Sequence, residues 1–305
     1  MVCYSDKRKI CGGEIGLTLK FLTFHTGCMV FNKDESLPVA MKSSRQFLFI
    51  ILLLLAGCYT VPETGRNTLN FMPESLLSEQ AAMAFDQMKQ DAPVSANPQY
   101  NERVRRVATR VLNVAVLTGN LPPVNQWEFV VFDDDATINA FAMPGGKVGV
   151  YTGLLKLAES DDELAAIIGH EIAHVSARHG NERMSQSVLL ITGGLALGYA
   201  VKDEDKGTQE AVMLAYGVGT TIGAQLPFSR LHENEADEIG LLYMARAGYD
   251  PREAVRFWKK MQSMKGQAVA EFLSTHPSHQ TRIARLTKLM PKAMAEYEAA
   301  KKRNG

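Results

Sequence analysis

Cysteine is scarce in this 305-residue chain and absent from most of it. The four cysteines are Cys3, Cys11, Cys28 and Cys58, and none follows. The long segment after Cys58 can therefore form no internal disulfide and no cysteine-based metal site. A metal bound in that segment must be held by His, Asp or Glu, which suits a catalytic zinc site better than a structural one.

An excess of charge of either sign is also missing. The 33 Lys and Arg residues balance 33 Asp and Glu residues, so the formal net charge at pH 7 is zero. Proteins that bind nucleic acid usually carry a basic footprint, and we therefore expect no nucleic-acid partner. The hydrophobic content of 46% and the charged content of 22% are ordinary for a globular protein.

The chain also lacks clear membrane-spanning segments near its start. The unbroken apolar run from Phe47 to Ala56 is too short to cross a bilayer. It follows the basic segment 41–45 and precedes Leu-Ala-Gly-Cys, an order typical of a secretory signal. The ending resembles a bacterial lipobox, in which the cysteine is lipidated. We expect 41–57 to be a lipoprotein signal peptide and Cys58 to carry the lipid; the alternative is a plain signal peptide or short anchor with an incidental cysteine.

The remaining boundaries follow from this signal. Residues 1–40 show no sustained periodicity, and a signal peptide does not normally begin so far into a chain, so we interpret them as a non-native or disordered extension. The turn formers in residues 58–72 indicate an extended tether. We expect residues 73–305 to form a single domain. Because Tyr59 rather than Asp follows the cysteine, resemblance to enteric-type sorting favours a lipid-anchored protein at the periplasmic face of the outer membrane.

The most informative stretch is 170–174, which reads H-E-I-A-H. In the H-E-x-x-H pattern, a helix offers two imidazoles to one zinc ion and a carboxylate to the attacking water. Residues four apart share a helix face, so His170 and His174 project together. Glu171 lies about 100° around the helix from His170, where it suits a catalytic base better than a third ligand. A capping box and an apolar stripe support the helix: Ser160 with Glu163, then Leu164, Ile168, Ile172 and Val175.

Two histidines leave a zinc ion short of ligands, so a separate element must supply the third. Glu233 and Asp237 are one turn apart on a helix that we expect over 229–247. We interpret Glu233 as the third ligand and Asp237 as the carboxylate that holds the second ring nitrogen of a ligand histidine. Glu235 faces away and is interpreted as a solvated carboxylate, and His232 as a surface or packing residue.

Two strand-like runs, 138–143 and 147–152, flank a Pro-Gly-Gly turn and predict a β-hairpin. In zinc peptidases with a helix-plus-sheet core, the strand beside the cleft accepts an extended substrate as an additional strand. Asn139, Phe141 and Met143 are therefore candidates to face substrate, and the alternative is that they are ordinary sheet residues. Hydrophobic periodicity predicts a strand at 127–132 and helices at 73–91, 98–117, 279–289 and 291–302.

Two apolar, glycine-dotted runs, 188–201 and 211–224, follow the motif helix. Both are short for a membrane span, and the polar loop between them suggests a helical hairpin. We favour packing of both helices in the core. The alternative is a flap that leans on the bilayer or covers the cleft.

Several motifs together resemble the gluzincin zinc metallopeptidases of the HtpX, BepA and CAAX-prenyl-protease group, in their periplasmic lipoprotein branch. The H-E-x-x-H motif is followed by Glu233-x-x-Ala236-Asp237. The similarity covers about Glu74 to Lys292, and the further matching stretches are 139–142 with 144–146, 152–155, 227–230, and 274–278 with 282–283.

The resemblance implies an α+β, mostly helical fold with a zincin-type core, in which a small sheet places a β-hairpin edge strand beside the motif helix. It implies one Zn²⁺ per chain, with His170, His174 and Glu233 as ligands and Glu171 as base. In some members a histidine that matches His276 approaches the zinc and regulates it. His276 or Arg282 is also a candidate to stabilise the transition state.

The function expected from these features is zinc-dependent endoproteolysis of unfolded or misassembled cell-envelope proteins. The alternative is a latent peptidase that acts mainly as an outer-membrane-protein assembly or chaperone factor, in contact with envelope assembly machinery. A third interpretation, a structural zinc protein, predicts a closed four-ligand site and gives Glu171 no role.

Overall fold

The computed structural model describes residues 57–118, 121, 127–264, 276 and 280–304. The chain divides into two units, residues 1–46 and 47–305, and the description concerns the second. The predicted extension over 1–40 and nearly all of the predicted signal peptide over 41–57 lie outside the described residues. Both therefore stay predictions.

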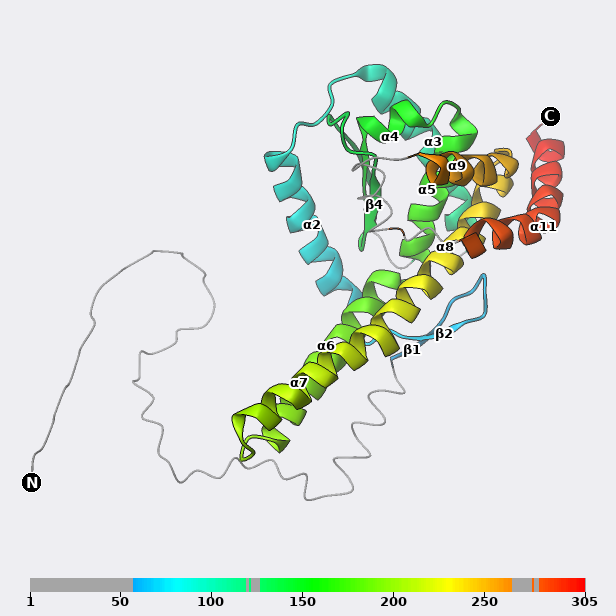
Figure 1. The fold of residues 1–305 in the computed structure, drawn as a ribbon. Helices are drawn as coiled ribbons and strands as arrows, with labels where there is room; N and C mark the ends of the chain where they lie inside the picture. The colour runs from blue at the N-terminus through cyan, green and yellow to red at the C-terminus, as the bar shows by residue number, and fades with distance from the viewer. Residues whose placement is uncertain (1–56, 119–120, 122–126, 265–275, 277–279, 305) are drawn as a thin grey trace, which may run out of the picture. The chain divides into compact units, whose positions relative to one another are not determined.

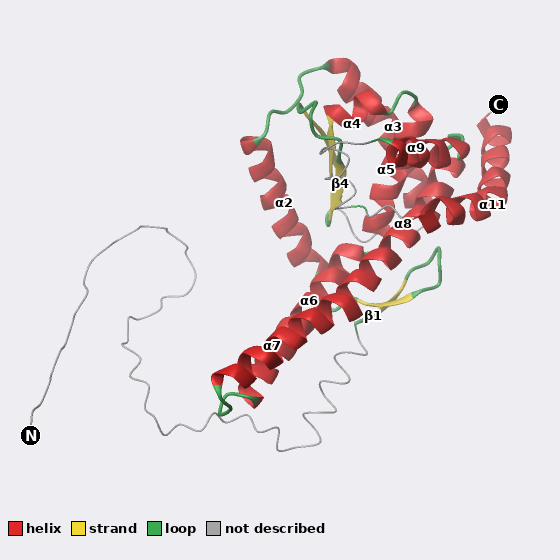
Figure 2. Ribbon diagram, in the orientation of Figure 1, coloured by secondary structure: helices red, strands yellow, loops and turns green. Residues whose placement is uncertain are grey.

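The described part is mostly helical with two small sheets, which confirms the predicted α+β class (Figure 2). The strands are β1 (Cys58–Thr60), β2 (Asn67–Leu69), β3 (Glu128–Phe132), β4 (Ala140–Met143) and β5 (Lys147–Tyr151). The helices are α2 (Glu74–Asp91), α3 (Pro98–Leu117), α4 (Thr152–Leu157), α5 (Asp161–Ser176), α6 (His179–Ala200), α7 (Lys206–Thr220), η1 (Thr221–Gln225), α8 (Leu226–Arg246), α9 (Arg252–Ser263) and α11 (Gln280–Asn304).

The larger sheet has the order β3-β5-β4, with β3 parallel and β4 antiparallel to β5. Gly145 and Gly146 adopt φ of 80° and 77° in the connection between β4 and β5, a conformation that favours glycine. Among the described residues β4 pairs on one side only, and α5 packs against it. In the described part of the chain β4 is therefore an edge strand, and it lies beside the motif helix α5 (Figure 1).

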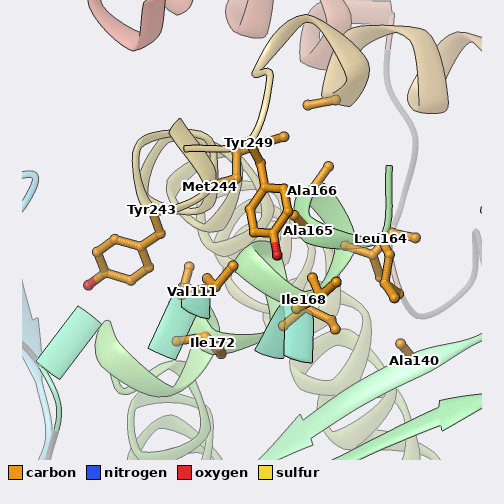
Figure 3. Close-up of a cluster of buried hydrophobic side chains, with 14 of the residues drawn as sticks. Val111, Ala140, Leu164, Ala165, Ala166, Ile168, Ile172, Tyr243, Met244 and Tyr249 are labelled. Atoms are coloured by element: carbon orange, nitrogen blue, oxygen red, sulfur yellow. The ribbon is translucent and has the colours of Figure 1, made fainter. Parts of the chain in front are cut away.

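Helix α5 is the centre of the core. Its N-cap is Ser160, whose Oγ accepts a hydrogen bond from the Glu163 backbone N at 3.1 Å. Every residue from Glu163 to Ser176 is buried. Figure 3 shows α5 side chains such as Ile168 among buried side chains from α3 and α8. The helix that carries the motif is therefore held on several sides at once.

Helices α5 and α8 approach each other unusually closely at Gly169 and Gly240. A Cβ on Gly240 would lie 2.7 Å from the backbone N of His170, and a Cβ on Gly169 would lie 2.8 Å from the carbonyl oxygen of Gly240. Neither glycine leaves room for a side chain, so the backbones can touch. This contact fixes the distance between the H-E-x-x-H motif and the helix that carries Glu233.

Residues 58–72 do not form the predicted extended tether. Strands β1 and β2 pair antiparallel in a small sheet, and Val61 and Thr68 are buried. Arg66 forms ion pairs with Glu182 and Glu235 at 2.8 and 2.7 Å. Polar side-chain bonds that the local sequence cannot reveal therefore dock this segment on the helices.

The prediction that 188–201 and 211–224 pack in the core is wrong. Helices α6 and α7 form a hairpin that projects from the rest of the described unit (Figure 1), and α7 has no buried residue. Large apolar side chains are exposed along it: Leu189, Ile191, Leu195, Tyr199, Leu214, Val218 and Ile222. By length and composition alone, the helical stretch Lys206–Arg246 could cross a membrane, the one such stretch within the described ranges.

The C-terminal helices predicted at 279–289 and 291–302 form one helix, α11, with Pro291 inside it. Proline removes one helical hydrogen bond and usually ends or kinks a helix. Here Leu286, Ala293 and Ala300 are all buried. Packing on both sides of the proline therefore outweighs the lost bond.

Candidate metal centre

Helices α5 and α8 bring three donor groups together. The Nε2 atoms of His170 and His174 are 3.1 Å apart. Oε2 of Glu233 lies 3.3 Å from Nε2 of His170, and Oε1 of Glu233 lies 3.3 Å from Nε2 of His174. Donors bound to a tetrahedral zinc at 2.0–2.1 Å are roughly 3.3 Å from one another. The separations and the chemistry of the donors therefore fit a zinc ion, as expected from the sequence.

A fourth group, His276, enters the same cluster. Its Nδ1 lies 3.2 Å from Oε2 of Glu233 and 3.3 Å from Nε2 of His170. Single donor atoms from all four residues, including His174, lie within 4.8 Å of one another, and all four side chains are buried. A cation at this point can thus be approached by either three or four protein ligands.

Glu171 stands on the open side of the cluster. It is buried, and its Oε1 is 3.5 Å from Nε2 of His276. It borders a cavity of ≈ 310 Å³ whose walls are Phe141, Ala142, Glu171, His174, Arg183, Glu233 and His276. The carboxylate is therefore placed next to the donors without being one of them.

Asp237 and Arg282 stand behind His170. Oδ1 of Asp237 lies 3.1 Å from Nδ1 of His170, which leaves Nε2 directed at the other donors. The guanidinium of Arg282 makes two hydrogen bonds to Asp237, one of them 2.7 Å long, and its Cζ lies 3.6 Å from the ring centroid of Trp258. Arg282, a candidate for contact with the transition state, also lies 3.4 Å from Oε2 of Glu233 through its Nη1 and is absent from the cavity wall.

The charges around the donors favour a cation. Burial lowers the pKa of His170, as does the charge of Arg282, but hydrogen bonds to Asp237 and Glu233 raise it to about 9. Burial raises the pKa of Glu233, yet hydrogen bonds to the two α5 histidines hold it well below its usual range. Burial raises the pKa of Glu171. A proton and a metal ion therefore compete for His170, and metal binding should release that proton.

One interpretation from the sequence is wrong on the other side of the site, and of the two alternatives for His232 the structure shows the packing residue. Glu235 is buried rather than solvated and accepts a hydrogen bond from His179 at 3.0 Å. His232 is buried and bonds to Glu182 at 2.9 Å. Nδ1 of His179 lies 2.8 Å from Nδ1 of His174, the ring nitrogen that faces away from the other donors. A wheel drawn on one helix cannot show contacts between helices.

The three candidates for the substrate strand separate into different environments. Phe141 borders the cavity and also stacks on Phe132, with ring centroids 6.1 Å apart. Met143 packs on the same aromatic cluster and does not border the cavity. Asn139 precedes β4, and its carbonyl accepts a hydrogen bond from the Tyr151 backbone N at 3.0 Å. Of the three, Phe141 is best placed to meet a substrate.

Convergent histidines and a carboxylate, set beside an open sheet edge in an α+β fold, define a metallopeptidase. Residues 98–290, more than half of the chain, match the sequence profile of peptidase family M48. The chain therefore belongs to peptidase family M48, whose members use zinc. The family resemblance inferred from the motifs is confirmed at this level.

Several characterised proteins are similar to this chain. The mitochondrial metalloendopeptidase OMA1 of Arabidopsis thaliana is 40% identical over 173 residues, 57% of this chain and 33% of its own length. The OMA1 of Schizosaccharomyces pombe is 31% identical over 269 residues, 84% of this chain and 75% of its own length. The beta-barrel assembly-enhancing protease of Yersinia pestis is 30% identical over 211 residues, 65% of this chain and 40% of its own length. The chain thus spans a third to three quarters of these relatives.

Proposed function

We propose that this chain is a zinc endopeptidase that hydrolyses unfolded or misassembled proteins of the bacterial cell envelope. His170, His174 and Glu233 hold one zinc ion, and Glu171 is the general base. The observation that carries the proposal is the convergence of three donor groups at separations close to those of a tetrahedral site, next to a buried carboxylate that is not a donor.

Each residue of the site has a separate role in peptide hydrolysis. When bound at these donors, zinc supplies Lewis acidity that polarises the scissile carbonyl and lowers the pKa of the attacking water. Glu171 accepts a proton from that water and delivers it to the leaving amine. Asp237 accepts the Nδ1–H of His170 and keeps Nε2 directed at the centre. Arg282 holds Asp237 in place through its hydrogen bonds.

The edge of β4 supplies the binding surface for substrate. Within the described part of the chain its outer side has no neighbouring strand, so its backbone groups there can offer the hydrogen bonds that an extended peptide needs to join a sheet as another strand. Phe141 and Ala142 of β4 border the same cavity as Glu171, so a strand added there would pass the base. Unfolded or misassembled chains expose such extended segments more often than folded domains do, which supports them as substrates.

Two features support a place at the membrane surface. Cys58 is an exposed free cysteine at the start of β1, compatible with lipid attachment. It borders a cavity of ≈ 580 Å³ together with Leu189, Leu190 and Leu231 at the base of the α6–α7 hairpin. The anchor and the exposed apolar hairpin would then meet the bilayer on the same side. We place the protein on the periplasmic face of the outer membrane.

The test of the activity is the variant Glu171→Gln. It keeps the shape of the side chain and removes the base, so it should bind zinc as the wild type does and lose cleavage of casein or another unfolded protein by at least about 10²-fold. Zinc content is measured by atomic absorption and cleavage by release of labelled peptides. Full cleavage by this variant would overturn the assignment of Glu171 and the mechanism with it.

A second function is favoured by His276 alone. Because His276 lies within the donor cluster, it can act as a fourth ligand and keep the peptidase latent. The protein would then serve mainly as an assembly or chaperone factor for outer-membrane proteins, in contact with envelope assembly machinery. The name of the Yersinia pestis relative, a beta-barrel assembly-enhancing protease, is compatible with that role.

A further inference from the structure

A buried chain of hydrogen bonds leads away from His174, on the side opposite the other donors. Nδ1 of His174 lies 2.8 Å from Nδ1 of His179, and Nε2 of His179 lies 3.0 Å from Oε2 of Glu235. Glu235 in turn accepts hydrogen bonds from Thr64 and, at 2.8 Å, from Nε of Arg66. This series of hydrogen bonds ends at Thr64 and Arg66, in the turn between β1 and β2.

The tautomer of His174 determines the proton positions along this series of hydrogen bonds. A His174 that offers Nε2 to a metal keeps its own proton on Nδ1, and that N–H donates to Nδ1 of His179. His179 then carries its proton on Nε2 and donates it to Glu235. Each nitrogen has one role and none conflicts, so the arrangement selects the tautomer of His174 that binds metal.

The surroundings hold His179 in this role. Its ring is fully buried and stacks on His232, with ring centroids 4.2 Å apart. Its Nδ1 faces His174 and its Nε2 faces Glu235, so one ring can accept from the first and donate to the second. Arg178, just before it, adopts φ of 56°, a left-handed conformation that a non-glycine residue adopts at a cost. That conformation turns the chain so that the first residue of α6 faces back towards α5.

Arg66 ties the chain of bonds to the N-terminal segment. One guanidinium pairs with Glu235 and also with Glu182, the latter through two hydrogen bonds of 2.9 and 2.8 Å. Glu182 is further bonded to His232. A single arginine from the β1–β2 turn therefore compensates two buried carboxylates, and without it both would face a desolvation cost.

We propose that His179, Glu235 and Arg66 are positioning residues that orient the zinc ligand His174, so that the docked β1–β2 segment after Cys58 forms part of the metal site. The inference rests on the proposed zinc site and adds residues to it from the part of the chain nearest the predicted anchor. None of the three touches the cavity in which substrate would bind, so their effect passes through His174.

The experiment compares zinc affinity in matched variants of the full chain, by competition with a chromophoric chelator. Arg66→Ala and Glu235→Gln should each weaken zinc binding about 10–100-fold, the range typical of groups that orient a metal ligand. Arg66→Lys keeps the charge and should restore part of the affinity. His179→Phe fills the buried site without a hydrogen bond and should shift the visible absorption bands of the Co²⁺-substituted protein.

The control is Arg246→Ala. Arg246 also ties the β1–β2 turn to the body, through Glu63 at 2.8 Å and Glu296 at 3.2 Å, and its side chain is as shielded as that of Arg66. It has no bond to His179 or Glu235, so its loss should lower thermal stability and leave zinc affinity unchanged. Equal zinc affinity in Arg66→Ala and Arg246→Ala would overturn the inference alone. Absence of zinc binding by the wild type would overturn the proposed function as well.

Discussion

Nε2 of His276 lies 3.5 Å from Oε1 of Glu171, while Nδ1 of the same ring lies 3.2 Å from Oε2 of Glu233. One imidazole therefore separates the proposed base from a proposed zinc ligand. A water molecule that attacks a substrate must be near both carboxylates, so the ring competes for the space that water needs.

We expect His276→Ala to cleave casein several-fold faster than the wild type, because the substitution opens the fourth position at the metal. Initial rates at saturating zinc give the comparison. The double variant with Glu171→Gln should be inactive, which excludes a contaminating protease. A His276→Ala variant that binds zinc but cleaves more slowly would instead assign His276 to stabilisation of the transition state.

Gly240→Ala should loosen the metal site without touching a donor. The new Cβ would lie 2.7 Å from the backbone N of His170, so α8 must move and carry Glu233 with it. Such overpacking costs roughly 1–3 kcal/mol, and we expect a lower melting temperature together with weaker zinc binding.

Gly217→Ala is the matched control for this substitution, because a Cβ there meets nothing within 4 Å. Helix propensity alone should then stabilise the protein by up to about 1 kcal/mol. Calorimetry of both variants, with and without zinc, separates the two effects. Unchanged zinc affinity in Gly240→Ala would show that α8 can shift without displacing Glu233.

Glu182 makes the fold sensitive to acid. Burial raises its pKa, but hydrogen bonds from His232 and Arg66 lower it from 4.5 to about 2. A carboxylate with a depressed folded-state pKa stabilises the fold above its unfolded pKa, and that contribution is lost as pH falls from about 4.5 to about 2. The contribution at neutral pH is of the order of 3 kcal/mol.

Thermal unfolding between about pH 6 and pH 3 checks this expectation. Glu182→Gln should be less stable at neutral pH and should lose less stability on acidification than the wild type. Glu102→Gln serves as the control, since Glu102 forms an exposed pair with Arg105. If the two variants show the same pH dependence as the wild type, Glu182 does not carry this acid sensitivity.

The apolar hairpin should bind lipid without help from the anchor. Leu195 and Ile222 are 72% and 63% exposed, and burying each such side chain is worth roughly 1.5–3 kcal/mol. In a Cys58→Ser background, Leu195→Glu with Ile222→Glu should therefore reduce co-sedimentation with vesicles at least about tenfold.

Leu117→Glu is the control for this pair, because Leu117 is 87% exposed at the end of α3, outside the hairpin. It should sediment with vesicles as the parent does. If the double variant leaves vesicle binding unchanged and instead turns a dimer into a monomer in light scattering, the hairpin contacts a second copy of the chain rather than lipid.

Local patterns predict the parts of this fold that local physics determines. The helices expected at 73–91 and 98–117 differ from α2 and α3 by at most one residue, since breakers bound both and each has a periodic apolar face. The association of Glu233 with His170 and His174 was expected from ligand chemistry and shared faces. The contact between Gly169 and Gly240, which allows the two helices to approach so closely, could not be predicted from the sequence and is seen only in the structure.

The failures have a common physical origin. Glu235 is interpreted as solvated from the sequence because its partner Arg66, which compensates the buried charge, lies 169 residues away in the chain. The apolar run 188–201 looked like core because composition reports hydrophobicity and not what covers it. Pro291 predicted a helix boundary because the hydrogen bond that proline removes can be read from the local sequence. The tertiary packing that outweighs this loss cannot.

The stretch Lys206–Arg246 is helical throughout, with the short π-helical segment η1 between α7 and α8. Its first half has no buried residue, and its second half carries Glu233 and Asp237. In a rigid helix, a tilt of the exposed first half would displace Glu233 in the second half. A force that tilts the exposed half is felt at Glu233 unless η1 bends first, and the wider turn of η1 is the natural hinge.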